Sequence, residues 1–226
     1  MIDELVGKIH HADCMAFMRA MPDKCVDLTL TDIPYGECDQ ESGGLRTLDK
    51  DFADRCEFNL IEFATELKRI TRSNIYIFCG IGQISELYNF YRQDLSVRLC
   101  QWQKTNPSPM NGQHIWLSAT ENCLFVKFPG AVFNEFCRPN VWKFPCGDSS
   151  LHPTKKPNEL FSYLIKTSSD PKDIVFDPCI GSGTTALAAI AAGRKYIGVE
   201  KNERMVNLCR QQIRRNRDMF YEESIR

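Results

Sequence analysis

Two segments of the chain carry residue types that could bind a nucleoside and act on it. In the first, an apolar strand ends at Asp177 and leads through Gly181 and Gly183 into an alanine-rich helix. Glycines at such a turn permit a tight bend and a close approach of the backbone to a ligand. A later strand ends at Glu200, where a carboxylate can hold the two hydroxyls of a ribose. Together these residues outline a nucleoside-cofactor site.

A Gly-x-Gly turn alone fits a packing turn, a nicotinamide dinucleotide site or an S-adenosylmethionine site. The full dinucleotide fingerprint Gly-x-Gly-x-x-Gly is absent, because Ala186 holds the place of the third glycine. A phosphate-binding P-loop is disfavoured because Gly183 is followed by Thr184 and no Lys-Ser/Thr pair, so no side chain would grip a β- or γ-phosphate. S-adenosylmethionine carries no phosphate, so a site for it needs neither the third glycine nor the Lys-Ser/Thr pair.

The second segment is an apolar strand that ends in Asp32, Ile33, Pro34 and Tyr35. Taken alone, this pattern also fits an ordinary turn at the end of a strand. With its neighbours it resembles the β-group of amino-methyltransferases that act on DNA, whose hallmark is Asp-Pro-Pro-Tyr. Ile33 departs from that hallmark. The departure is mild because the backbone carbonyl is the group that matters there, and a residue before proline already favours extended conformations.

The resemblance implies a mechanism in which the base leaves the helix before it reacts. The Asp32 carboxylate and the Ile33 carbonyl would accept the two N–H bonds of an exocyclic amino group, which favours a pyramidal nitrogen with a localised lone pair. Tyr35 would stack on the extruded base. The nitrogen would then attack the sulfonium methyl in line, and proximity would supply much of the rate.

Further segments extend the resemblance over most of the chain. It implies that Asp13 meets the adenine of the cofactor, that Trp102 and Lys104 border the base pocket, and that a His-Pro-Thr-x-Lys-Pro stretch lines the methionine end of the cofactor. At Cys179 the family usually has phenylalanine, so we expect a looser contact there. The implied cofactor-binding residues are Asp13, His152, Thr154, Lys156, Asp177, Pro178, Gly181, Gly183, Thr184 and Glu200.

The order of the motifs defines the β-group, because the Asp-x-Pro-Tyr segment precedes the glycine turn in a circularly permuted arrangement. Aspartate at position 32 favours adenine N6, since cytosine-N4 enzymes of this kind more often carry serine there. Both targets present an NH₂ beside a ring nitrogen, so a cytosine-N4 methyltransferase stays open as an alternative. A non-catalytic relative that binds DNA or S-adenosylmethionine is a third hypothesis, and a nicotinamide oxidoreductase is a fourth.

Strand-like apolar runs alternate with helix-like periodic segments, which predicts an α/β fold with a doubly wound, mostly parallel sheet. The predicted strands are 26–31, 74–79, 122–128, 173–176 and 196–199. The predicted helices are 15–20, 60–70, 84–91, 159–167, 185–192 and 203–214. Three segments, 37–57, 105–116 and 129–153, lack this periodicity and read as functional loops. We expect the first of them to cover the active cleft.

With 226 residues and 43% hydrophobic content, the chain fits one methyltransferase domain over residues 1–226. It has no run of about 18 apolar residues and no signal pattern, so we expect a soluble cytoplasmic protein. Eleven cysteines without Cys-x-x-Cys spacing indicate reduced thiols. We expect no metal, since His10, His11, His114 and His152 lack ligand spacing to cysteines.

DNA is the expected partner, although the formal net charge of −1 means that contacts must come from local basic patches. The target-recognition insert expected around residues 105–150 is short and offers few side chains to base edges. We therefore expect relaxed site specificity, or a homodimer or second subunit that completes it, and a restriction-modification context is one setting for such an enzyme. The basic candidates are Arg92, Arg98, Lys104, Lys127, Arg138, Lys143, Arg210, Arg214, Arg215 and Arg217.

Overall fold

One eight-stranded sheet runs through the protein in a computed structural model that describes residues 2–35, 56–107, 114–147 and 156–225. The strand order is β1-β8-β7-β2-β3-β5-β4-β6. Among these strands β5 alone runs antiparallel to its neighbours. The strands are β1 (Lys8–His11), β2 (Val26–Asp32), β3 (Thr71–Cys79), β4 (Ser96–Lys104), β5 (Thr120–Lys127), β6 (Val141–Phe144), β7 (Ile174–Asp177) and β8 (Lys195–Glu200). The α/β class predicted from the sequence is confirmed, with a mixed and mostly parallel sheet.

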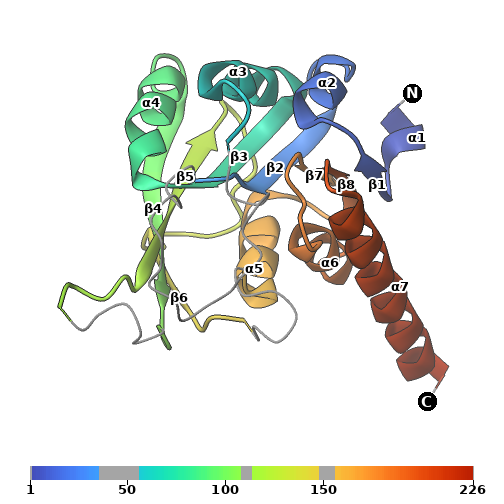
Figure 1. Cartoon of the computed structure of the whole chain (residues 1–226). Helices are drawn as coiled ribbons and strands as arrows, with labels where there is room; N and C mark the ends of the chain where they lie inside the picture. Colours follow the sequence, from blue (N-terminus) through green and yellow to red (C-terminus); the bar gives the residue numbers. More distant parts are fainter. Residues whose placement is uncertain (1, 36–55, 108–113, 148–155, 226) are drawn as a thin grey trace.

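Helices cover both faces of this sheet (Figure 1). Helices α2, α3 and α4 pack their apolar residues into one core, and α5, α6 and α7 pack theirs into a second core on the opposite face. The helices are α1 (Ile2–Leu5), α2 (Cys14–Arg19), α3 (Leu60–Ile70), α4 (Ile81–Tyr91), α5 (Asn158–Ser168), α6 (Thr184–Ala191) and α7 (Glu203–Ile225). The sheet is therefore a rigid platform whose strand ends can hold a site.

The central strand β2 shows why the sequence forms this platform. Leu28 and Leu30 are fully buried in one core and Val26 in the other, as expected for a parallel strand covered on both faces. Its buried Thr29 shares a 2.7 Å hydrogen bond with Thr71 of β3, so these two hydroxyls satisfy each other. Burial on both sides fixes the register and hence the position of the residues that follow the strand.

The structure differs from the predicted elements at five places, and two of these are helix α1 and strand β4, which were not predicted. Strand β1 was not predicted because it is only four residues long and carries two histidines. Strand β6 lies inside the predicted irregular stretch 129–153, where it pairs with β4. Helix α7 runs to Ile225 and not to residue 214, since the added residues include no glycine or proline that would end the helix but lack apolar periodicity. Residues 37–55 of the predicted cleft loop lie outside the described residues.

No helix in the described part of the chain has the length and apolar character needed to cross a lipid bilayer.

Candidate active site

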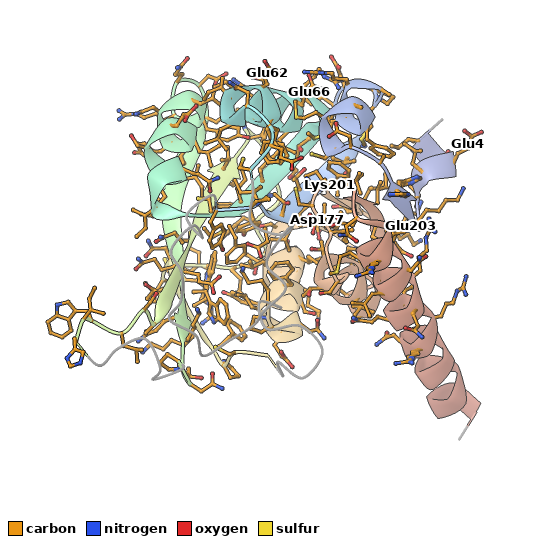
Figure 2. All side chains as sticks on the ribbon, viewed as in Figure 1. Glu4, Glu62, Glu66, Asp177, Lys201 and Glu203 are labelled. Carbon is orange, nitrogen blue, oxygen red and sulfur yellow. The ribbon has the colours of Figure 1, made fainter. Side chains whose placement is uncertain are left out.

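Four carboxylates predicted from the sequence lie at one edge of the sheet. The neighbouring parallel strands β1, β8, β7 and β2 all point their carboxyl ends to this edge. Asp13 follows β1, Glu200 ends β8, Asp177 ends β7 and Asp32 ends β2. Figure 2 shows Asp177 near the centre of the molecule, between the two helical layers. The glycine turn and the Asp32–Tyr35 turn therefore follow adjacent strands, as one shared cleft requires.

The turn from Asp32 to Tyr35 is held by strand β3 and helix α4. The Ile33 N–H donates to the Phe78 carbonyl at 3.1 Å, and the Ile33 side chain is 2% exposed within the core. The Gln83 amide donates to the Pro34 carbonyl at 2.9 Å, while its oxygen accepts from the Gly80 N–H at 2.9 Å. Gln83 was not identified from the sequence, where it is one polar residue in a helix.

A buried lysine joins the two residues that the sequence assigns to catalysis. The Lys156 ammonium lies 2.5 Å from Asp32 Oδ2 and donates to the Tyr35 hydroxyl at 3.2 Å. It lies 2.9 Å from Glu121 Oε2, and its side chain is only 6% exposed. The Tyr35 hydroxyl in turn donates to Asp32 Oδ1 at 3.0 Å. The sequence placed Lys156 among the cofactor residues, and the structure places its charge at the Asp32 carboxylate.

Glu121, at the start of β5, was missed in the sequence because it is a single carboxylate beside an apolar strand. Its second oxygen lies 2.8 Å from the Lys104 ammonium, so the site contains two carboxylates and two ammonium groups. The feature that would have identified Glu121 is the cross-strand pairing of β4 with β5, in which Glu121 lies opposite Trp102. That pairing depends on the fold and cannot be read from spacing.

The charges shift one another's proton affinities in ways that follow from burial and pairing. Burial raises the pKa of Asp32, and the Lys156 ammonium offsets only part of this effect. Burial raises the pKa of Glu121, but Lys156 and Lys104 outweigh it, so the net change is a lowering. Burial lowers the pKa of Lys156, and the two carboxylates outweigh it, so its net pKa is raised. The pKa of Tyr35 is raised by burial and by the same carboxylates.

The glycine turn is organised around the buried Asp177 carboxylate. Its two oxygens accept from the Cys179 N–H at 3.0 Å and from the Thr185 hydroxyl at 2.5 Å. Burial raises the pKa of Asp177 to about 7. Gly183 has φ of +96°, and a Cβ there would lie 2.5 Å from the sulfur of Cys209 on α7. The close approach that requires glycine at this position is thus to α7.

The carboxylate of Glu200 is fixed by backbone groups and remains half-buried. The Gly181 N–H donates to Glu200 Oε2 at 3.1 Å, and the Asn202 N–H donates to Oε1 at 2.8 Å. Each carboxylate oxygen keeps further acceptor capacity, which suits two sugar hydroxyls. Pro178 and Thr184 have buried side chains, so a ligand at this turn would meet mainly their backbone.

Asp13 and Cys179 have structural partners within the protein. The Asp13 carboxylate accepts from the Ala16 N–H at 2.8 Å and so caps helix α2. The thiol of Cys14, the next residue, forms a hydrogen bond with Cys179 that lowers the pKa of Cys14. Helix α2 and the glycine turn therefore meet through these two thiols, at the position where the resemblance expects the adenine of the cofactor.

The two residues expected at the base pocket differ in exposure. Trp102 is 2% exposed, and its indole N–H donates to the Phe144 carbonyl at 2.9 Å. The Lys104 ammonium lies 5.4 Å from the Trp102 ring centroid and reaches the charged group through Glu121. Trp102 thus supports Lys104 from within the core. His152 and Thr154 lie outside the described residues.

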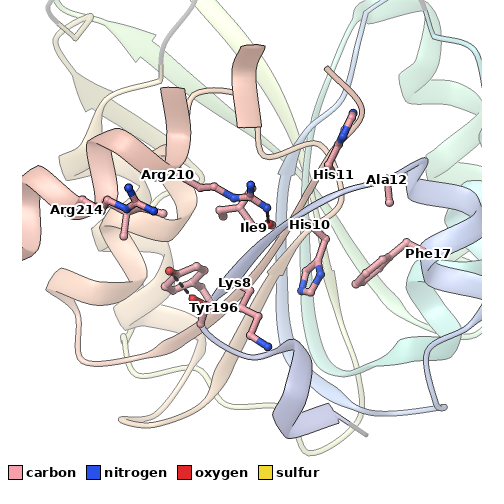
Figure 3. A pocket seen from close by; sticks show the side chains of 11 residues that line it. Lys8, Ile9, His10, His11, Ala12, Phe17, Tyr196, Arg210 and Arg214 are labelled. Atoms are coloured by element: carbon pink, nitrogen blue, oxygen red, sulfur yellow. Dashed lines mark hydrogen bonds between the residues drawn. The ribbon is translucent and has the colours of Figure 1, made fainter. Parts of the chain in front are cut away.

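A cavity of about 450 Å³ lies along the edge strand β1, between α2 and α7 (Figure 3). It is lined by basic groups that include Lys8, Arg210 and Arg214, and by none of the predicted catalytic or cofactor residues. Arg210 is held by its 2.7 Å hydrogen bond to the Ile9 carbonyl. Among the other basic candidates for DNA contact, Arg138 pairs with Glu135 on the surface.

Known proteins share both the sequence and the architecture. Residues 131–211 match the N6/N4 family of DNA methylases. Over 252 aligned residues the chain is 28% identical to the Type II methyltransferase M.HinfI of Haemophilus influenzae, covering 94% of this chain and 70% of that protein. It is 37% identical over 115 residues to the DNA adenine methyltransferase YhdJ of Escherichia coli strain K12, covering 49% of this chain and 32% of that protein.

Solved structures agree with this assignment. The M1.HpyAVI-SAM complex superposes with a TM-score of 0.71 at 26% identity, covering 91% of this chain and 98% of that one. The cytosine-N4-specific PvuII DNA methyltransferase has a TM-score of 0.69 at 16% identity, covering 90% and 88%, and shows a shared fold. The paired turns at the ends of β2 and β7, the match over residues 131–211 and these relatives agree: the chain is similar to the N6/N4 family of DNA methylases.

Proposed function

We propose that this protein transfers a methyl group from S-adenosylmethionine to N6 of adenine in DNA. The observation that carries the proposal is the direct pairing of β2 with β7. Asp32 and Tyr35 follow one of these strands, and Asp177 with its glycine turn follows the other. Adjacent parallel strands lie about 5 Å apart, so a base at Asp32 and a cofactor at the glycine turn would be neighbours.

The residues at the glycine turn fit this methyl donor. The half-buried Glu200 carboxylate can accept hydrogen bonds from the two ribose hydroxyls. The glycines of the turn let the backbone approach the ligand, where a side chain would block it. Pro178, Gly181, Gly183 and Thr184 would line the donor, and His152, Thr154 and Lys156 its methionine end. When bound, S-adenosylmethionine supplies a sulfonium methyl group. M1.HpyAVI, a similar protein, has been crystallised with it.

The protein's own groups prepare the target nitrogen. The Asp32 carboxylate and the Ile33 carbonyl accept the two N–H bonds, which localises the lone pair that attacks the methyl carbon. Tyr35 stacks on the extruded base, and Lys104 borders its pocket from β4.

Adenine is favoured over cytosine by two observations. Aspartate stands at position 32, and the relative YhdJ is named as a DNA adenine methyltransferase. Cytosine N4 is the alternative, since it offers the same pair of N–H bonds to the same acceptors.

The remaining features of the proposal concern arrangement and partners. The catalytic turn precedes the glycine turn in the chain, which we interpret as a circular permutation of the motifs within one domain, 1–226. The segment around 105–150 would read the DNA. Ile115 and Trp116 in this segment are 73% and 94% exposed, which suits contact with a partner. A homodimer or second subunit would complete site recognition.

The direct test incubates the protein with labelled S-adenosylmethionine and unmethylated DNA and identifies the modified nucleoside. We expect N6-methyladenine. N4-methylcytosine would establish the alternative, and binding without any modified base would mark a non-catalytic relative. Thermal shifts complete the test, since S-adenosylmethionine should raise the melting temperature and NAD should leave it unchanged.

A further inference from the structure

The charge group formed by Lys156, Asp32, Glu121 and Lys104 raises a problem for the proposed chemistry. The inference that follows rests on the proposed function. Asp32 has to accept an N–H from the target base, yet its carboxylate already carries a buried ammonium as counter-ion. Oδ2 lies 2.5 Å from the Lys156 ammonium, and Oδ1 accepts from the Tyr35 hydroxyl. An ammonium in this position competes with the incoming N–H for the carboxylate.

The same ammonium also opposes the chemical step. As the C–S bond breaks, its electrons go to sulfur, and the nitrogen lone pair forms the new N–C bond. The target nitrogen then carries positive charge until it releases a proton. A fixed positive group beside it disfavours that charge, whereas a free Asp32 carboxylate favours it.

Glu121 offers Lys156 a second counter-ion in the same buried place. Its Oε2 lies 2.9 Å from the ammonium, while its Oε1 stays with Lys104 at 2.8 Å. Because Lys156 already touches both carboxylates, a small displacement can leave it paired with Glu121 alone. Glu121 belongs to β5, which is hydrogen-bonded on both sides, so its position is well defined.

We propose that Glu121 is a positioning residue that draws the Lys156 ammonium away from Asp32 when the target amino group arrives. Both ammonium groups then remain paired with Glu121, and the Asp32 carboxylate exchanges its ammonium partner for an N–H of the base. Asp32 becomes available to the base without unfolding or solvent access. Glu121 acts through Lys156 and makes no contact with the reacting atoms.

The variant Glu121→Gln tests this role, because it keeps the shape of the side chain and removes its charge. Lys156 would then have Asp32 as its only counter-ion and would stay on it. We expect kcat to fall about 10- to 100-fold, the value of one charge-assisted interaction, with the Kd for S-adenosylmethionine within about twofold of wild type. The acid limb of the pH profile of kcat should move to lower pH. The Glu121 carboxylate helps to raise the pKa of Asp32, so its removal lowers that pKa.

A second substitution separates this role from simple support of the fold. In the double variant Glu121→Gln with Lys156→Gln, the competing ammonium is gone and Asp32 is free. We expect its kcat, at saturating cofactor, to exceed that of Glu121→Gln alone by about fivefold or more. A double variant no faster than the single one would overturn the proposal, and so would a Glu121→Gln protein with unchanged kcat and pH profile.

Glu62→Gln is the matched control, since Glu62 loses only a surface pair with Arg19 and lies on the outer side of α3 (Figure 2). It should keep wild-type kinetics. If Glu121→Gln does not fold, Glu121→Asp replaces it; the shorter carboxylate should lower kcat and shift the acid limb, and wild-type values of both would refute the role. Wild-type protein that transfers no methyl group contradicts the proposed function itself, which distinguishes the two failures.

Discussion

At the scale of single residues, Asp32 separates chemistry from cofactor binding. In the Asp32→Asn variant the amide can no longer accept as a charged group, so we expect kcat to fall about 10³-fold. The Kd for S-adenosylmethionine should change little, because the proposed function places Asp32 at the base and not at the cofactor. Lys156 keeps Glu121 as a counter-ion, so the protein should remain folded. Single-turnover methyl transfer and calorimetric titration measure the two quantities, and lost affinity with normal turnover would refute the assignment.

Tyr35 should depend on its ring more than on its hydroxyl. Tyr35→Phe keeps the stacking surface and loses only the hydrogen bonds of the hydroxyl with Asp32, Glu121 and Lys156, whereas Tyr35→Ala loses both ring and hydroxyl. We expect Tyr35→Phe to retain at least about tenfold more kcat/KM than Tyr35→Ala, since base stacking contributes roughly 1–3 kcal/mol. Steady-state assays on one DNA duplex provide the comparison. Equal losses in the two variants would assign the role to the hydroxyl.

Residues that follow strands could be found from the sequence, and residues that depend on pairing could not. Asp32, Asp177 and Glu200 each end an apolar run, and local spacing is enough to place them at one edge of a parallel sheet. Glu121 and Gln83 reach the same site through the antiparallel strand β5 and the first turn of α4. Their roles depend on contacts across long sequence separations, which no local pattern encodes.

At the scale of elements, the contact between the glycine turn and α7 is tight enough to test. Gly183→Ala would place a Cβ 2.5 Å from the Cys209 sulfur in a backbone conformation with φ of +96°. We expect a loss of roughly 2–4 kcal/mol in the free energy of unfolding, from backbone strain and overpacking together. Chemical denaturation followed by circular dichroism measures it.

Two further variants apportion that loss. Gly193→Ala has φ of +71° with no atom within 4 Å of the added Cβ, so it should show the backbone strain alone. Combining Gly183→Ala with Cys209→Ala removes the sulfur. The loss in unfolding free energy of the double variant should therefore be smaller than the sum of the losses in the two single variants. Strict additivity would mean that the sulfur does not limit this turn.

At the scale of the whole molecule, the buried Asp177 makes stability depend on pH. Its pKa is about 7 in the folded state against an ordinary value of 3.8, so the folded protein binds the proton more tightly. This carboxyl therefore favours folding at low pH, and its contribution declines as pH rises from about 4 to about 7.

The variant Asp177→Asn has no such proton. Between pH 5 and pH 7.5, we expect the unfolding free energy of the wild type to fall by roughly 2 kcal/mol relative to that of Asp177→Asn. Urea denaturation at the two pH values measures this. A difference that stays constant, or that moves in favour of the wild type, would show that the folded carboxyl is ionised throughout.

The architecture was predictable where strands are apolar and central, whereas β4, with polar residues between its apolar positions, was not predicted. Strands β2, β3, β5, β7 and β8 were all predicted, because burial on both faces leaves a continuous apolar run. The peripheral strands β1 and β6 are four residues long and owe their pairing to a preformed neighbour. The direction of β5 was beyond reach as well, since strand orientation follows from tertiary pairing.

That reversed direction decides where this fold can change its substrate preference. Strand β4 ends at Lys104 and β5 begins at Thr120, so the chain leaves and rejoins the sheet at the same rim, beside Asp32. Lengthening a connection between two fixed ends costs little conformational entropy. Grafts between residues 104 and 120 would lie at the rim where DNA is proposed to bind and would leave the strand pairings intact, which makes this connection the natural place to engineer new sequence preferences.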